Sequence, residues 1–235
     1  MKVDTSNMTM VYVAGGNGAR DNYKELKWSI RSLKNVKYKN LVVIGKDIDW
    51  LSKDVLIEVD DCMGIKHANV INKLLIACDS DKVSENFILM NDDFFFMRPQ
   101  DIRKFKKKEL FMLSKGKGAR YKAVIENTLD ELEIPNPEDY ELHYPMIINK
   151  VKFKEILNKY PWKSKELLHR SIYGNEMDEK DYTEISRDFK VYTYDEWLRY
   201  KNGPFISTSE RVVNFTGVSK DLNSSFKSPS IYEVK

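Results

Sequence analysis

Two adjacent carboxylates interrupt an apolar stretch near the middle of the chain. Asp92 and Asp93, preceded by Asn91, separate a strand-like run at residues 87–90 from the hydrophobic residues 94–96. Neighbouring carboxylates in apolar surroundings are costly unless a cation or a substrate uses them. In open α/β sheets, ligands bind beyond the carboxyl ends of the strands. We therefore predict a catalytic site here; a turn between two strands, which Asn and Asp also favour, is the alternative.

A glycine-rich segment follows the first strand-like run, residues 10–14. Its glycines are Gly15, Gly16 and Gly18. They allow the backbone to approach a phosphate closely, and the N-terminal end of the helix expected next would favour the same anion. The segment matches neither a P-loop nor a dinucleotide-binding fingerprint. An ordinary strand-to-helix turn is therefore the alternative.

Arginine and histidine residues supply the other candidates. Arg20 and Arg31 add positive charge near the glycine segment, and Arg suits bidentate phosphate contacts. The alternative for Arg31 is that it is a surface residue of a helix without a binding role. His143 lies between aromatic residues and before a proline, which would fix its ring for acid–base chemistry or phosphate binding; a hydrogen-bonded structural histidine is the alternative. Arg170 begins a segment with hydroxyl and amide groups that resembles an anion-binding set. The alternative for that segment is a helix end closed by Gly174.

Alternating strands and helices must position these residues. The alternation predicts a mostly parallel sheet in one domain of 235 residues, followed after Pro99 by a mainly helical part. A strand signal at 110–113 and an irregular, exposed segment at 223–230 are also expected. The expected strands are 10–14, 40–45, 55–59, 87–90 and 189–192, and the expected helices are 23–33, 68–78, 149–158, 163–170 and 194–200, the last capped by Asp195.

Composition limits the classes of function. The 39 basic and 36 acidic residues leave a net charge of +3, which is too small to indicate nucleic-acid binding by itself. The basic cluster at residues 103–108 is more typical of a solvated surface. Cys62 and Cys78 have neither zinc-site nor disulfide-framework spacing, which favours a reducing cytoplasm. No signal core and no stretch of ~20 apolar residues is found, so we expect a cytoplasmic protein without a membrane span.

The order of these motifs resembles that of the Stealth family. The segments 25–32 and 91–93 carry the resemblance most closely, and the regions of His143 and Arg170 follow it more loosely, over roughly residues 10–175. Members of that family are sugar-phosphate transferases whose nucleotide-binding core resembles that of A-type glycosyltransferases. The family's first motif carries an acidic residue that is missing here, so the chain departs from the family in the donor pocket.

The resemblance implies an α/β fold with a single Rossmann-like core of the glycosyltransferase A type and a helical C-terminal elaboration. Residues 8–115 would bind the nucleotide sugar, 116–220 would form the acceptor and catalytic half, and 221–235 would be a tail. The implied reaction moves a sugar-1-phosphate from a nucleotide-sugar donor, expected to be a UDP-sugar, to an acceptor hydroxyl. The chain would be a compact bacterial or phage-like member of the family.

The same resemblance assigns roles to individual residues. Asp92 and Asp93 would bind Mg²⁺ or Mn²⁺, or one of them would act as the base for the acceptor. Arg170 would pair with the transferred phosphate, and His143 would orient it or carry the acceptor's proton. The residues expected to bind the donor are Gly15, Gly16, Gly18, Arg20, Arg31 and Asn91.

Two other functions stay open. One is a metal-dependent glycosyltransferase that attacks the anomeric carbon and releases a nucleoside diphosphate, with a glycan or a modified DNA base as acceptor. The other is a non-catalytic module that binds nucleotide sugars or nucleic acid, the latter through residues 103–108. Release of a nucleoside monophosphate would indicate phosphate transfer instead. Neither the sugar nor the oligomeric state can be read from the chain.

Overall fold

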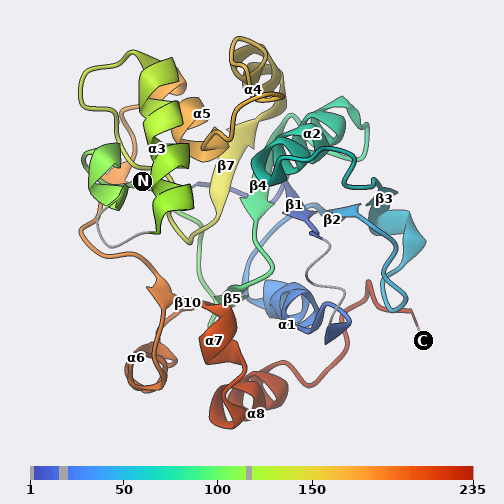
Figure 1. Ribbon diagram of the computed structural model, residues 1–235. Helices are drawn as coiled ribbons and strands as arrows, with labels where there is room; N and C mark the ends of the chain where they lie inside the picture. The colour runs from blue at the N-terminus through green and yellow to red at the C-terminus, as the bar shows by residue number, and fades with distance from the viewer. Residues whose placement is uncertain (1–2, 16–20, 115–117, 235) are drawn as a thin grey trace.

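The computed structural model describes residues 3–15, 21–114 and 118–234. A five-stranded sheet runs through its centre in the order β3-β2-β1-β4-β7, and helices cover both faces (Figure 1). β1 to β4 are mutually parallel, whereas β7 pairs antiparallel with β4, so the predicted mostly parallel sheet is confirmed. The strands are β1 (Thr9–Val13), β2 (Asn40–Gly45), β3 (Leu56–Glu58), β4 (Asn86–Met90) and β7 (Met146–Asn149).

Each face of this sheet has its own apolar core. Successive side chains of a strand point to opposite faces, so Met10 and Val11 of β1 enter different cores. One core lies under α1 (Lys24–Ser32), which continues into a short 3₁₀ turn, Leu33–Asn35. The helices over the other core are α2 (Lys66–Asp79), α3 (Ala119–Leu132), α4 (Lys150–Leu157) and α5 (His169–Met177).

A second, smaller sheet returns the C-terminal part of the chain to the acidic segment. β5 (Phe94–Phe96) directly follows Asp93 and pairs antiparallel with β10 (Phe205–Thr208). β10 pairs in turn with β9 (Lys190–Val191). Helices α6 (Tyr194–Tyr200), α7 (Glu210–Val213) and α8 (Thr216–Ser225) follow these strands and help to enclose a third apolar core. Each of the two sheets therefore contains strands from both of the predicted halves, residues 8–115 and 116–220.

Some segments differ from the sequence-based expectations. Residues Leu110–Ser114 form a 3₁₀ helix rather than a strand; Leu110 and Leu113 pack against the core, whereas Phe111 and Met112 are exposed. The helix expected over 163–170 begins at His169, and Gly174 lies inside it instead of closing it. A Cβ at Gly174 would lie 2.5 Å from ring atoms of Tyr140, so close packing requires glycine here.

The C-terminal region is more regular than expected. Helix α8 includes residues 223–225, and the side-chain oxygen of Asn223 accepts a hydrogen bond from Trp28 Nε1 at 3.0 Å, which anchors the helix. Thr193 caps α6 instead of Asp195, because Thr193 and Glu196 form a reciprocal capping box. Helix α3 was missed, although its buried positions recur at helical spacing.

The remaining short elements complete the described chain. They are a 3₁₀ turn, Lys53–Val55, and the paired strands β6 (Phe105–Lys106) and β8 (Thr183–Glu184). Among the helices within the described ranges, none has both the length and the apolar character that crossing a membrane requires.

Candidate active site

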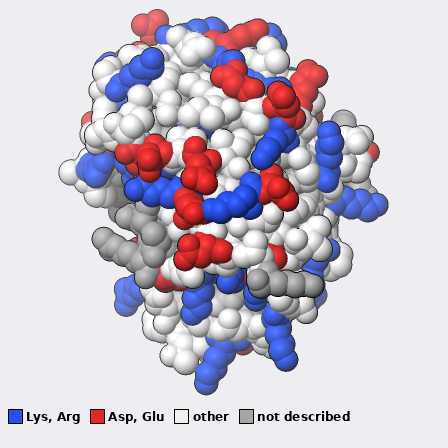
Figure 2. Space-filling model, turned by 90° about the vertical axis from the view of Figure 1, so that its right-hand side faces the viewer, with Lys and Arg blue, Asp and Glu red and all other residues white. Residues whose placement is uncertain are grey.

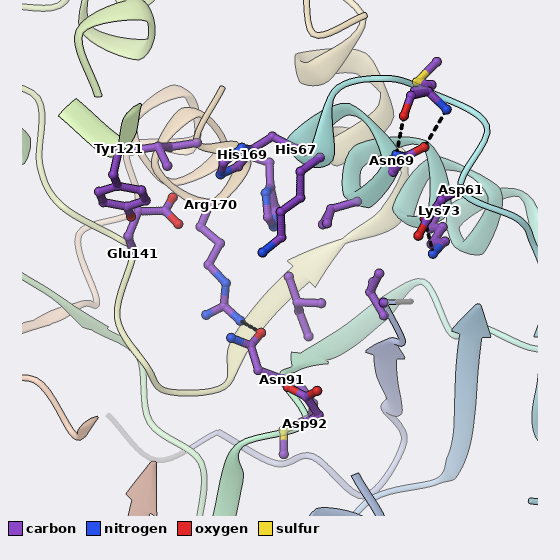
Figure 3. Close-up of a pocket in the computed structure, with 18 of the residues that line it drawn as sticks. Asp61, His67, Asn69, Lys73, Asn91, Asp92, Tyr121, Glu141, His169 and Arg170 are labelled. Atoms are coloured by element: carbon purple, nitrogen blue, oxygen red, sulfur yellow. Dashed lines mark hydrogen bonds and ion pairs between the residues drawn. The ribbon is translucent and has the colours of Figure 1, made fainter. Parts of the chain in front are cut away.

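A cavity of about 600 Å³ opens at the carboxyl ends of β1 and β4 (Figure 3). The first turns of α2, α3 and α5 form its opposite wall, represented by His67, Tyr121 and His169. Helix N-terminal ends carry partial positive charge, so their convergence favours a ligand with negative charge. The position agrees with the rule that ligands bind beyond the carboxyl ends of parallel strands.

Asp92 lies at the β4 end of the cavity, where its side chain remains accessible through the opening. The surrounding protein atoms and the neighbouring carboxylate of Asp93 raise the pKa of Asp92 to about 6. Glu25 of α1 faces the same acidic group, and partial burial with the charges of Asp92 and Asp93 raises its pKa to about 8. Three carboxyl groups, those of Glu25, Asp92 and Asp93, thus influence one another beside the end of β4, and a pKa of about 8 keeps Glu25 mostly protonated near neutral pH.

Asp93 is turned away from the cavity and is only 8% exposed. Its Oδ2 atom accepts hydrogen bonds from Lys190 Nζ and from Ser207 Oγ, both at 2.9 Å. Lys190 belongs to β9 and Ser207 to β10, so the second sheet supplies both partners. The two adjacent aspartates therefore have different surroundings: one faces a cavity and the other is bonded to protein groups.

Arg170 connects Asn91 to the loop before β7. Its Nη2 atom donates to Asn91 Oδ1 at 3.1 Å, and its Nη1 atom donates to the carbonyl oxygens of Leu142 and Tyr144 at 3.2 and 2.8 Å. The guanidinium is buried, yet it lines the cavity (Figure 3). Close to it, burial raises the pKa of Glu141 to about 7 although the charge of Arg170 opposes this. The bonds of Arg170 therefore fix both Asn91 and the loop.

His143 is held by Asp188, which the sequence analysis did not single out. His143 Nδ1 lies 2.6 Å from Asp188 Oδ2, and the backbone N–H of His143 donates to Asp188 Oδ1 at 2.9 Å. Burial would raise the pKa of Asp188, but these contacts with His143 lower it to about 2. His143 does not line the cavity.

A buried lysine supports the end of β1 at the cavity. Lys73 of α2 is 2% exposed, and its Nζ atom donates to the carbonyl oxygen of Ala14 at 3.0 Å. The same atom pairs with Asp61 Oδ1 at 2.6 Å. These contacts hold the backbone next to Gly15, which lines the cavity.

The other predicted donor-binding residues are placed differently. Gly16, Gly18 and Arg20 lie outside the described residues. Arg31 points to the C-terminal segment, where its Nε and Nη2 atoms donate to the carboxylate oxygens of Glu233 at 2.7 and 2.6 Å. Among the predicted site residues that the structure describes, Gly15, Asn91, Asp92 and Arg170 line one cavity, whereas Asp93, His143 and Arg31 do not.

Lys190, Ser207, Asp188 and Lys73 are site neighbours that sequence reasoning missed. One of them left a local signal, because Lys190 is a charged residue between Phe189 and Val191 in an apolar run. The acidic pair was noticed for the same reason. The other three lie in segments whose polar residues are unremarkable by type and spacing.

The described side chains do not fit the predicted Mg²⁺ or Mn²⁺ at Asp92 and Asp93. Such cations are commonly held by one or two carboxylates together with substrate phosphates, and here Asp93 Oδ2 already accepts two hydrogen bonds, one of them from an ammonium group, which repels a cation. Within residues 3–15, 21–114 and 118–234, no group of three or more His, Cys, Asp or Glu side chains is arranged to hold a metal ion.

Comparisons with known proteins support the fold. No family model matches the sequence and no curated protein matches it, so the resemblance to the Stealth family stays a prediction. The bifunctional glycosyltransferase WbbM, solved without ligand, is similar over 97% of this chain and 50% of its own, with 10% identity and a TM-score of 0.52.

Two further solved structures have lower TM-scores. The galactosyltransferase LgtC, solved with donor and acceptor sugar analogues, is matched over 95% of this chain and 96% of its own, with 9% identity and a TM-score of 0.48. A glycosyltransferase involved in glycosylation of the major capsid of PBCV-1 is matched over 94% and 100%, with 8% identity and a TM-score of 0.44. The likeness to WbbM supports the predicted α/β fold with its mainly parallel central sheet.

Proposed function

We propose that this protein transfers a sugar from a nucleotide-sugar donor to a hydroxyl group of an acceptor. The observation that carries the proposal is the cavity at the carboxyl ends of β1 and β4, with Asp92 at one end, in a chain with a glycosyltransferase fold. Fold alone does not determine function, so the chemistry of this cavity provides the argument.

The donor would place its diphosphate in the cavity. The N-terminal ends of α2, α3 and α5 favour negative charge there, and Gly15 lets the backbone approach the ligand. Lys73 keeps the end of β1 in position through Ala14. The predicted UDP-sugar is the first donor to examine, and glycans and modified DNA bases are acceptors to include in the same screen.

The transfer breaks the bond between the anomeric carbon and the diphosphate oxygen, whose electron pair leaves with the nucleoside diphosphate. The acceptor oxygen forms the new bond to the same carbon and loses its proton. We assign that proton to Asp92, which lines the cavity and is accessible. A pKa of about 6 keeps this carboxylate ionised near neutral pH while leaving it basic enough to accept a proton.

The basic cluster at residues 103–108 gives little support to a nucleic-acid-binding module. Lys104 pairs with Glu179 and Asp181, and Lys106 pairs with Glu138 at 2.5 Å. Acidic and basic side chains are also interspersed across the middle of the face shown in Figure 2. Phosphate recognition needs uncompensated positive charge, which these ion pairs reduce.

Product analysis tests the proposal. The protein is incubated with UDP-sugars and a panel of acceptors, and the released nucleotide is identified; UDP is expected. Asp92→Asn should lower kcat by roughly 10²–10⁴-fold, because the acceptor's proton then has no base. Its Tm should stay near that of the wild type, since Asp92 is accessible. Release of UMP would instead establish the sugar-1-phosphate transfer implied by the Stealth resemblance, and absence of nucleotide binding would contradict both.

A further inference from the structure

In the acidic segment 91–93, the two residues on either side of Asp92 each accept a hydrogen bond from a basic side chain. Asn91 offers an amide oxygen instead of a carboxylate, and Arg170 donates to it at 3.1 Å. The buried Asp93 accepts from Lys190 and Ser207 through one oxygen, at 2.9 Å each. Two basic side chains thus use the oxygens on either side of Asp92.

Lys190 lies among the carboxyl groups of Glu25, Asp92 and Asp93. Its positive charge lowers the pKa of Asp92 and of Glu25, against the stronger opposing effect of burial, and Asp93 bonds it directly. The Lys190 side chain is 18% exposed, so it is mostly withdrawn from solvent. The ammonium group of Lys190 therefore offsets the negative charge of carboxylates that would otherwise attract a divalent cation.

Lys190 acts on the cavity through its charge rather than by direct contact. It does not line the cavity, and its partner Asp93 is turned away from it. The adjacent Asp92 does line the cavity, and the positive charge of Lys190 lowers the pKa of Asp92. Because charges interact strongly in a protein interior, Lys190 offsets negative charge that a diphosphate in the cavity would otherwise meet.

We propose that Lys190 neutralises the acidic segment beside the donor's diphosphate, as a divalent cation would otherwise do, so that donor binding needs neither Mg²⁺ nor Mn²⁺. The inference rests on the proposed function, because it concerns the diphosphate of the nucleotide sugar. Asp93 and Ser207 then hold the ammonium group in place. Arg170 has a different role, since its donors are directed to Asn91 and to two backbone carbonyl groups.

The first test measures cation binding without any nucleotide. MnCl₂ is added to the wild-type chain and to Lys190→Met, and Tm is recorded. We expect no shift for the wild type and a rise of roughly 5 °C or more for the variant, because loss of the ammonium group leaves Asp93 and its acidic neighbours to attract the cation. A rise in the wild type, or none in the variant, would overturn the proposal.

A matched control separates this effect from the loss of any lysine. Lys106 is also 18% exposed and also pairs with a carboxylate, that of Glu138, away from the acidic segment. Lys106→Met should therefore gain no response to Mn²⁺, and an equal gain there would overturn the proposal. Lys190→Gln keeps an N–H donor for Asp93 without the charge, and it replaces Lys190→Met should the latter fail to fold.

The second test measures UDP binding by calorimetry, with EDTA or with Mn²⁺ present. The wild-type affinity should agree within about twofold between the two conditions, and Lys190→Met should bind UDP about tenfold or more weakly in EDTA. Loss of wild-type binding in EDTA would overturn the inference. A wild-type chain that binds UDP in neither condition would contradict the proposed function, and the Mn²⁺ titration would still decide on Lys190.

Discussion

The two flanks of the segment 91–93 each contain a largely buried basic side chain, and the two are bonded differently. On one flank, the guanidinium of Arg170 donates to Asn91 and to two carbonyl oxygens of the loop before β7. On the other flank, the ammonium group of Lys190 pairs with the carboxylate of Asp93. Arg170 is thus bonded to neutral acceptors in the protein, whereas Lys190 faces an excess of negative charge.

This difference indicates how one cluster can combine rigidity with ligand binding. The planar guanidinium has donors in a fixed arrangement, and those of Arg170 link two backbone segments. The ammonium group of Lys190 is a compact charge bonded to Asp93, and it offsets negative charge near the cavity. We infer that one flank positions the site and the other neutralises it for the donor, and variants of each flank can test this division.

The largest effect on stability is expected for Arg170→Met. The substitution leaves Asn91, two carbonyl groups and Glu141 without the buried cation that they face. Leaving a buried acceptor without its donor costs about 1–3 kcal/mol, so with three acceptors the free energy of unfolding should fall by about 3–5 kcal/mol. Urea denaturation measures it. A loss below about 1 kcal/mol would contradict the assignment of the rigid flank.

An intermediate effect on stability is expected for Asp188→Asn, because Asp188 is connected to residues of both flanks. Asp188 binds His143, next to the carbonyl groups that Arg170 holds, and precedes Lys190 by two residues. Its folded-state pKa of about 2 lies below the ordinary value of 3.8, so its stabilisation is present above about pH 4 and is lost as the pH falls through 2. The variant should lose about 2 kcal/mol of unfolding free energy at pH 7.

The pH dependence supplies the control for Asp188. Wild type and Asp188→Asn should approach equal stability near pH 2, because the wild-type carboxylate is then about half protonated in the folded state and most of its stabilisation is lost. Urea denaturation at pH 7, 4 and 2.5 measures the difference. A difference that stays constant over this range would mean that packing, and not the ionised carboxylate, accounts for the contribution of Asp188.

A smaller effect is expected for Ser207→Ala on the Lys190 flank. Ser207 is fully buried and donates to Asp93 Oδ2 at 2.9 Å. Losing one hydrogen bond to a charged group should cost about 1.5 kcal/mol, measured by urea denaturation. Because Lys190 still neutralises Asp93, the variant should not gain the Mn²⁺ response predicted for Lys190→Met. Such a gain would show that the hydroxyl group of Ser207 excludes the cation as effectively as the ammonium group of Lys190.

The same division explains how much could be predicted from the sequence. Strands β1 to β4 and the position of Asp92 follow from local patterns, namely apolar runs and a polar interruption at the end of one run. The partners of Asp93 are 97 and 114 residues away along the chain, in strands too short to have a strong pattern. Which basic residue approaches a given carboxylate depends on tertiary packing, so no local spacing could assign Lys190 to Asp93.

The smallest effect is expected for Arg31→Gln, which tests the sequence-based prediction that Arg31 binds the donor. The structure directs this guanidinium to Glu233, 202 residues further along the chain, and to the carbonyl oxygen of Phe226. Gln keeps amide N–H donors that can reach some of these acceptors, so the free energy of unfolding should fall by only about 1 kcal/mol. UDP affinity should stay within about twofold of the wild type. A tenfold loss would place Arg31 at the donor and would end the distinction between one positioning flank and one neutralising flank.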